Sequence, residues 1–376
     1  MNRMNRATTR RRPRGCAHRP GPAWSAAAAG SSLLLLLAGC SSAGPSAAQP
    51  SAQGGSQESI AVENCGEELH FDVPPERVLL LETAPLTILD QLGLTDRIVA
   101  RAGDFNPDYY SSDLNQKVSG IESLTDDLDA SGHLAISQEE VVAHDPDLVL
   151  GQPDGVTREG LNAAGSQLLV QEVYCNDQDG DQHVGNGTDE RPGSDAASFD
   201  TLYREIEAYG EIFQRQDEAA DLTAQLRDRV AQVEDAAPGQ GRSAAVLYPS
   251  GGGADYAYGR GSMAHPQLQA AGLKNVFDDV EDRVFEVQAE ELVARDPDVL
   301  ILLYQGSADG AAAEGNSAGQ APDSISELIT DMPGAESMTA VQEDEIYAHL
   351  FNFTEPASPL TVDGLELIAE YAEEGS

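Results

Sequence analysis

Lysine is nearly absent from this chain. Of 22 basic residues only Lys117 and Lys274 are lysines, against 64 acidic residues, and the formal net charge is −42 at pH 7. Such a charge repels the phosphate backbone of nucleic acids and anionic lipid headgroups, so the composition excludes binding to DNA or RNA. An acidic, lysine-poor surface resembles that of proteins from salt-tolerant organisms, which describes the solvent rather than the function.

The N-terminus has no acidic residue and only a short apolar run. Residues 1–39 contain seven arginines followed by the run Leu33–Leu37, which is far too short to form a permanent membrane-spanning helix. A basic region, a short apolar core and small residues at a cleavage point predict a secretory signal over residues 1–39.

Cys40 follows Leu37-Ala-Gly39, and this tetrapeptide resembles the bacterial lipobox. The resemblance implies that Cys40 becomes the first residue of the mature protein, carries lipid and anchors the chain on the extracytoplasmic face of the cell membrane. An ordinary signal peptide with a chance cysteine is the alternative. Residues 40–59 are rich in Ser, Ala, Gly and Gln and are expected to form a flexible tether.

Cysteine is scarce as well, with four in the chain. Cys16 lies in the predicted signal and Cys40 at the lipid position, which leaves Cys65 and Cys175. In an exported chain these two are expected to form a disulfide. The bridge would close a loop of about 110 residues and stabilise the fold by about 4–5 kcal/mol in the chain-entropy model. Two free thiols or a metal-binding pair are the alternatives.

Patterns that carry catalysis are weak. Gly251–Gly253 follows a strand pattern without the Lys-Ser or Lys-Thr of a phosphate loop, and Gly261-Ser262 lacks the second glycine of a nucleophile elbow. The histidines form no His-x-His or His-x₃-His pair, and the glycine in Asp177–Asp181 is misplaced for a calcium loop. We expect no enzyme activity and no intrinsic metal or cofactor. A lipid-anchored hydrolase is the alternative of another class.

Two segments 151 positions apart are near-copies of each other. Ile136–Leu150 and Val287–Ile301 share Glu-Glu and Asp-Pro-Asp at matching places. Each reads as an amphipathic helix that ends at Asp-Pro, because proline cannot continue a helix, followed by a buried apolar strand. A duplicated helix–strand unit predicts an α/β fold of two similar lobes with a ligand cleft between them.

A second, weaker sequence similarity between the two halves supports the duplication. The strand patterns beginning at Arg77 and Ser243 each lead into a helix that stops at Gly93 or Gly272. Between the lobes, apolar residues recur at helical spacing and predict one long connecting helix over residues 214–238. The remaining boundaries are an N-terminal α/β lobe over 60–213 and a C-terminal α/β lobe over 239–376.

These features resemble the substrate-binding lipoproteins of ABC importers for iron siderophores, haem and cobalamin. The resemblance covers about residues 60–375. It is carried by an ordered set of motifs: Pro75–Leu81, Leu89–Val99, Asp145–Val149, Ala271–Phe277, Arg295–Val299, Met332–Gly334 and Ala340–Tyr347. It implies two Rossmann-like lobes joined by a single long helix, and a monomeric receptor that captures a bulky chelate and delivers it to a membrane permease.

The resemblance also assigns roles to the repeat. In the family, a glutamate near the start of this helix in each lobe meets arginines on the permease, which nominates Glu139 and Glu290 as docking residues. The neighbours Glu140 and Glu291 are repeated too. First-turn acids that only favour the helix dipole are the alternative.

Candidate cleft residues follow from the loops beyond strand ends, which face the crevice in open α/β sheets. They combine aromatic rings with a few polar groups, as suits an amphipathic chelate. The nominated residues are Thr83, Ala84, Asp104, Phe105, Gln152, Tyr256, Tyr258, Arg260, Phe285, Asn352, Phe353 and Glu355.

Few arginines are placed to reach the cleft: Arg101, Arg158 and Arg260. The negative charge of a trianionic catecholate chelate would not be neutralised in such a site. The sequence therefore favours a neutral or cationic ferric hydroxamate as the ligand. Haem and cobalamin are the alternatives within the family.

Overall fold

The computed structural model describes residues 59–125, 134–151, 155–175, 197–249, 255–305, 319–320 and 323–374. The predicted signal, Cys40 and the tether before residue 59 lie outside these residues, as does Gln152. No helix in the described ranges is both long and apolar enough to cross a membrane.

The first lobe is built on a parallel sheet with the strand order β5-β4-β3-β6-β7 in the described residues. Alternate residues of β3 face opposite core clusters, Leu80 one and Leu79 the other, so the sheet is covered on both faces. This explains why its strands are unbroken apolar runs. Its strands are β3 (Val78–Leu80), β4 (Ile98–Arg101), β5 (Glu122–Ser123), β6 (Leu148–Leu150) and β7 (Gln167–Leu169).

Short helices and a hairpin complete this lobe. The helices are α1 (Ala84–Gln91), α2 (Ser112–Ser119), α3 (Gln138–Ala143) and α4 (Arg158–Ala164), with 3₁₀ turns at Thr95–Arg97, Pro107–Tyr109 and Glu172–Tyr174. The antiparallel hairpin of β1 (Ile60–Asn64) and β2 (Glu67–Phe71) packs against β7 and against the helix that follows the lobe.

The second lobe has a mixed sheet in which β8, β12 and β14 are parallel and β9, β11 and β13 are antiparallel additions. The described strands run in the order β11-β9-β8-β12-β14-β13, and β10 pairs with β8. They are β8 (Ser243–Tyr248), β9 (Asp255–Tyr258), β10 (Lys274–Asn275), β11 (Val284–Val287), β12 (Val299–Tyr304), β13 (Gly319–Gln320) and β14 (Ile346–Leu350). The helices are α7 (Ala264–Ala270), α8 (Ala289–Arg295), α9 (Asp323–Thr330), α10 (Thr339–Gln342) and α11 (Pro359–Glu374), with 3₁₀ turns at Ala335–Ser337 and Phe351–Phe353.

The sequence repeat has the same structure in both lobes. Asp145 and Asp296 end their helices with φ angles of 48° and 45°, in the left-handed region. Two residues later, Asp147 accepts hydrogen bonds from the backbone N–H groups of Glu76 and Arg77, just before β3. Asp298 likewise accepts from the backbone N–H of Ser243, at the start of β8, at 2.8 Å. Each Asp-Pro-Asp therefore anchors the first strand of the main sheet in its own lobe, β3 or β8. The predicted two-lobed α/β fold is confirmed.

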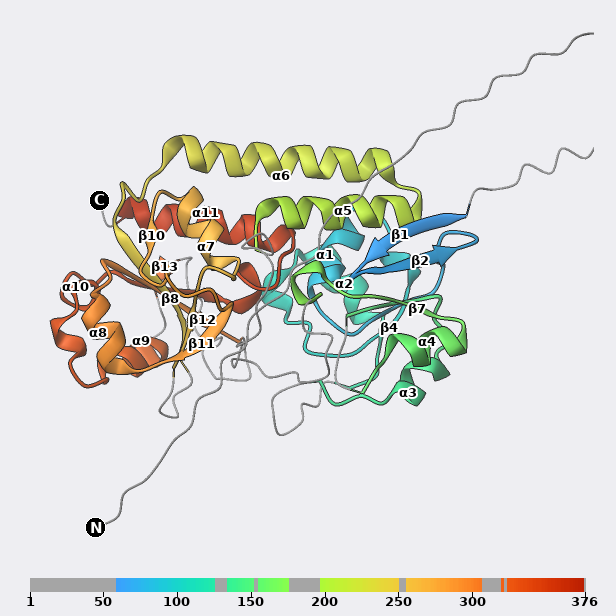
Figure 1. Ribbon diagram of the computed structural model, residues 1–376, viewed down its shortest axis with the longest axis horizontal. Coiled ribbons are helices and arrows are strands. Elements are labelled where there is room, and N and C mark those ends of the chain that lie inside the picture. Colours follow the sequence, from blue (N-terminus) through green and yellow to red (C-terminus); the bar gives the residue numbers. More distant parts are fainter. Residues whose placement is uncertain are drawn as a thin grey trace, which may run out of the picture. The chain divides into compact units, whose positions relative to one another are not determined.

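Two long helices come next in the chain, α5 (Phe199–Phe213) and α6 (Gln216–Ala236). Figure 1 shows α6 alongside α5 and α11, and it contacts both of them as well as α7. One hydrophobic cluster includes residues of both sheets together with Ile206 of α5, Leu226 of α6 and Leu365 of α11. The helix α6 lies within the range 214–238, and its role as the single connection between the lobes stays a prediction, as do the domain limits 60–213 and 239–376.

Candidate ligand-binding site

The turn after β14 meets the first lobe directly. The backbone N–H of Asn352 donates a hydrogen bond to the hydroxyl of Tyr109 at 3.0 Å, and the Asn352 side-chain amide donates to the Thr83 hydroxyl. The rings of Phe353 and Tyr109 pack edge-on with centroids 5.5 Å apart. Residues beyond the carboxyl ends of strands in both sheets are thus in contact, which is the place where open α/β sheets bind ligands.

Further aromatic residues stand at neighbouring strand ends. Tyr248, Tyr304 and Phe351 terminate or follow β8, β12 and β14, and each is half-buried. The Tyr248 and Phe351 rings are perpendicular, with centroids 6.1 Å apart. Burial raises the pKa of the Tyr304 hydroxyl, reinforced by Asp108, so it stays protonated and can donate a hydrogen bond. The group offers apolar ring surface with polar tips, as a bulky chelate requires.

Close packing holds the Phe351–Phe353 turn in place. The side-chain amide of the buried Gln267 donates to the carbonyl oxygens of Phe353 and Thr361, both at 2.7 Å. A Cβ on Gly364 of α11 would lie 1.8 Å from the Phe353 carbonyl oxygen. Only glycine allows this approach of helix to turn.

Arg283 contacts residues of both lobes, and the sequence nominations did not include it. Its guanidinium lies 5.5 Å from the centre of the Tyr174 ring in the first lobe and 3.5 Å from a carboxylate oxygen of Glu355. The other Glu355 oxygen accepts from the backbone N–H of Met263 at 2.8 Å. Burial raises the pKa of Glu355 above its ordinary value, while Arg283 and the Met263 N–H oppose the shift.

The three arginines nominated for the cleft have different surroundings. Arg101 lies over the Phe105 ring at 4.9 Å. Arg260 pairs with the exposed carboxylate of Glu281. Arg158 is buried in the first lobe, where it donates to the Leu168 carbonyl at 2.8 Å and supports the hairpin, so it cannot serve a ligand.

The nominated cleft residues separate by burial. Thr83, Tyr256, Arg260 and Phe353 are half-buried and Asp104 is exposed, so these keep surface for a ligand. Asn352 and Phe105 are largely buried and contribute mainly through their contacts. Three more are almost completely buried, with at most 3% of their surface exposed: Ala84, Tyr258 and Glu355.

Phe285 packs in a different part of the core from the aromatic residues described above. It packs edge-on against Phe277 at 5.3 Å and belongs to the separate core cluster on the α8 side of the second sheet. Phe285 was nominated with the other residues expected in loops beyond strand ends, but it lies within β11. Tyr248 and Tyr304 are the last residues of β8 and β12, and their positions at strand ends are a signal that the sequence nominations did not use.

The two docking candidates occupy equivalent places. Glu139 and Glu290 are each the second residue of their helix, α3 and α8, and both are exposed. Neither forms an ion pair with any residue that the structure describes. Glu291 differs, since it pairs with Arg295 one turn later at 3.0 Å.

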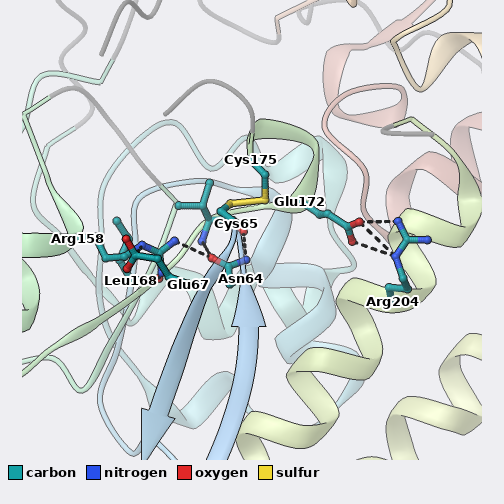
Figure 2. Close-up of a disulfide and its surroundings, with 9 residues drawn as sticks. Asn64, Cys65, Glu67, Arg158, Leu168, Glu172, Cys175 and Arg204 are labelled. Carbon is teal, nitrogen blue, oxygen red and sulfur yellow. Dashed lines mark hydrogen bonds and ion pairs between the residues drawn. A yellow bond between two sulfur atoms is a disulfide. The ribbon is translucent and has the colours of Figure 1, made fainter. Parts of the chain in front are cut away.

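Cys65 and Cys175 form a disulfide that joins the β1–β2 hairpin to the Glu172–Tyr174 turn (Figure 2). Around it, Asn64 accepts from Arg158 at 3.0 Å and Glu172 pairs with Arg204 of α5. The bridge therefore fixes the turn that carries Tyr174, the ring beneath Arg283.

Comparison with known proteins agrees with this architecture. The family described as periplasmic binding protein matches residues 78–349, which is well over half of the chain. The chain belongs to this family. Solved structures similar to it carry titles that name Fe3+-hydroxamate transport, haem binding and vitamin B12 binding, which matches the iron and B12 class of the family.

Three similar proteins illustrate the range of sequence identity and coverage. A solved Fe3+-hydroxamate transport protein of Saccharomonospora viridis is 48% identical with a TM-score of 0.69, covering 83% of this chain and 98% of that one. A haem-binding protein, BhuT, is 17% identical with a TM-score of 0.57, covering 80% of this chain and 98% of its own, and shares the fold alone. The cobalamin-binding protein of Halobacterium salinarum is 27% identical over 61% of this chain, which spans only 54% of that relative.

Family membership settles the class of activity. Periplasmic binding proteins capture solutes on the extracytoplasmic side and are not enzymes.

Residues 315–319 read Gly-Asn-Ser-Ala-Gly, which is the spacing of a nucleophile elbow. Most of that stretch lies outside the described residues, and β12 ends well before it. Within the described ranges, no group of three or more His, Cys, Asp or Glu could hold a metal ion.

Proposed function

We propose that this protein captures a ferric siderophore, of hydroxamate type, and delivers it to an ABC permease. The observation that carries the proposal is the group of tyrosine and phenylalanine rings from both sheets around the Asn352–Tyr109 contact. Rings with protonated hydroxyl tips pack against the apolar body of a chelate and bond to its oxygens.

Charge favours the hydroxamate class. Three hydroxamates neutralise Fe3+, whereas three catecholates leave a trianion. The Arg283 cation is paired with the Glu355 carboxylate, and Arg101 lies over the Phe105 ring. A trianion would find few cations here, and desolvating it would cost more than the site returns. The 48% identity to a protein named for Fe3+-hydroxamate transport supports the same choice.

A ligand panel tests the proposal. The exported protein is titrated with a neutral ferric trihydroxamate, a trianionic ferric tris-catecholate, haem, cobalamin and bare divalent ions, followed by tyrosine fluorescence and native mass spectrometry. We expect the trihydroxamate to bind most tightly. Tighter binding of cobalamin, the ligand named for the Halobacterium relative, would replace the proposal with the second candidate.

We propose further that lipid on Cys40 holds the monomeric protein at the membrane and that Glu139 and Glu290 dock it to the permease. One exposed carboxylate per lobe gives a two-point contact with arginines and sets the orientation of docking. The equivalent placement of the two glutamates at the starts of α3 and α8 supports this assignment.

A further inference from the structure

The buried side chain of Gln171 links three parts of the molecule. Its amide nitrogen donates to the carbonyl oxygen of Ala357 in the second lobe at 3.2 Å and to the carboxyl of Glu205 on α5 at 3.4 Å. Gln171 itself comes just after β7 of the first lobe and exposes only 2% of its surface. Both N–H groups of the amide are therefore in use, and one of them joins the two lobes.

The same pair of side chains leaves two buried oxygens over. Gln171 Oε1 and Glu205 Oε2 have no hydrogen-bond partner within the part of the chain that the structure describes. An amide oxygen and an ionised carboxylate oxygen can only accept, so neither can satisfy the other, and a buried acceptor left unpaired is costly. A single proton on Glu205 Oε2 turns that oxygen into a donor. The acid and the amide can then bond through both of their ends.

The charged groups around Glu205 also favour the protonated acid. Burial raises the pKa of Glu205 to about 8; the hydrogen bond from Gln171 opposes the shift, and the charges of Glu82 and Glu172 add to it. Glu82 lies just beyond β3, and Glu172 lies in the turn after β7, where it pairs with Arg204 (Figure 2). Two further carboxylates near a buried third one make its ionisation harder.

A cavity of about 480 Å³ beside the disulfide brings solvent next to Glu205. Glu205 lines it together with Arg204 and with Glu63 of β1. Tyr209, one turn further along α5, stays neutral because burial raises the pKa of its hydroxyl well above the ordinary value. Water in the cavity can therefore take the proton from Glu205 when the pH rises.

We propose that Glu205 and Gln171 form a pH-sensitive clasp that holds the two lobes together. With the proton in place, Glu205 donates to Gln171 Oε1 and accepts from Gln171 Nε2, and this fixes the amide so that its other N–H reaches Ala357. When the proton passes to water, two acceptors face each other, the amide turns away and the bond to Ala357 is lost. The clasp goes beyond the proposed function, because it acts on the contact between the lobes and needs no ligand.

Hydrogen–deuterium exchange of the wild type and of Glu205→Gln tests the clasp. Glutamine keeps a donor and an acceptor at every pH, so the clasp of the variant stays closed. The segments to follow are 171–175 and 357–361, whose backbone hydrogen bonds close the turns beside Gln171 and Ala357. The ratio of wild-type to variant exchange rates, which cancels the intrinsic effect of pH, should be near one at about pH 7. At about pH 9.5 it should be about tenfold higher, as loss of one buried hydrogen bond predicts.

Three further variants locate the titrating group. Glu207→Gln is the matched control, because it removes an exposed carboxylate from the same helix, and its exchange should match the wild type at both pH values. Glu82→Gln removes a neighbouring charge and should move the transition to lower pH without abolishing it. Gln171→Leu removes the amide, so both segments should exchange rapidly at either pH.

Infrared spectroscopy observes the proton itself. The difference spectrum between the wild type and Glu205→Gln should contain the C=O band of a carboxylic acid at neutral pH and lose it at alkaline pH. Absence of that band at neutral pH would overturn the inference.

The exchange data have equally definite outcomes. If the ratio stays near one at alkaline pH, the inference is overturned even where the unfolding free energy depends on pH, because Glu205 is then a buried acid without a role in the lobe contact. Loss of the transition in Glu82→Gln would place the titration at Glu82 and overturn it too. If Glu205→Gln does not fold, Gln171→Leu decides: the wild type should exchange more slowly than this variant at neutral pH and equally fast at alkaline pH.

Discussion

The backbone N–H of Asn352 and the hydroxyl of Tyr109 form a hydrogen bond of 3.0 Å across 243 positions of sequence. Both residues are buried, and they come from different lobes. Burial raises the pKa of Tyr109 above its ordinary range, so the hydroxyl remains protonated while its oxygen accepts the N–H. This one contact joins the loops that follow β4 and β14.

Removing the Tyr109 hydroxyl should weaken that junction. Tyr109→Phe leaves the buried N–H of Asn352 without its acceptor, which costs about 1–3 kcal/mol of unfolding free energy. Urea denaturation followed by circular dichroism measures the change. Tyr110→Phe is the matched control, because the Tyr110 hydroxyl is buried without a hydrogen-bond partner among the described residues. The Tyr110 variant should be as stable as the wild type or slightly more so, and equal losses in both variants would contradict the assignment.

Glu205 should make stability depend on pH. Burial raises the pKa of this carboxyl to about 8; the hydrogen bond from Gln171 opposes the shift and the charge of Glu82 adds to it. Between about pH 4 and pH 8 the folded state therefore keeps a proton that the unfolded chain has released. The protonated Glu205 carboxyl therefore favours the folded state at low pH. This stabilisation is lost as the pH rises through the pKa of Glu205 in the folded state. Glu205→Gln should match the wild type near pH 5 and exceed it by about 2–4 kcal/mol near pH 9.

The control for this prediction is Glu207→Gln, which lies on the same helix at an exposed position. Unfolding free energies at the two pH values give the comparison, and differences between variants remove the general repulsion among the many acidic residues. A Glu205 variant that tracks the wild type at both pH values would show that the carboxyl gains solvent in the folded state.

The disulfide should be present and stabilising in the exported protein. Peptide mapping without reductant should recover Cys65 and Cys175 in one linked fragment, and recovery of both as free thiols would contradict this. Cys65→Ser with Cys175→Ser should lower the unfolding free energy by about 4–5 kcal/mol in the chain-entropy model. Reduction of the wild type should reproduce that loss, and reduction of the double variant should change nothing.

Permease docking can be separated from ligand capture. Glu139→Ala with Glu290→Ala should leave chelate affinity unchanged, because both residues lie on exposed helix starts, and should strongly reduce uptake by cells. Each single change should reduce uptake less than the pair, since one surface ion pair contributes modestly.

Glu140→Ala with Glu291→Ala is the comparison for the docking pair. Of these two substitutions, Glu140→Ala is the simpler to interpret, because Glu291 already pairs with Arg295 in the folded protein. Impaired uptake in this pair alone would move the docking role by one residue, and normal uptake in both pairs would make the repeat purely structural.

The duplicated helix–strand unit and its Asp-Pro-Asp are predictable from sequence because their determinants are local. Proline ends the helix, and apolar runs mark strands covered on both faces. Gly93 and Gly272 end α1 and α7 with positive φ angles of 71° and 76°, as the sequence predicts.

The candidate site is less predictable because it depends on contacts between distant segments. Tyr109 gains its role only through Asn352, and Arg283 only through Tyr174 and Glu355. Glu355 reads as a polar residue beyond a strand end, yet it is fully buried and bonds to the Met263 N–H and to Arg283. The end of a strand is visible in sequence, whereas the direction and burial of the side chain there are decided by tertiary packing.

Cys175 directly follows Tyr174, the ring against which Arg283 rests. The position of that ring therefore depends on an oxidation that the reducing cytoplasm opposes and the outside of the cell permits. A newly made chain still inside the cell lacks the disulfide, so the Tyr174 ring and the Arg283 side chain that rests on it are held less firmly. Export of the protein would thus also complete the candidate ligand site.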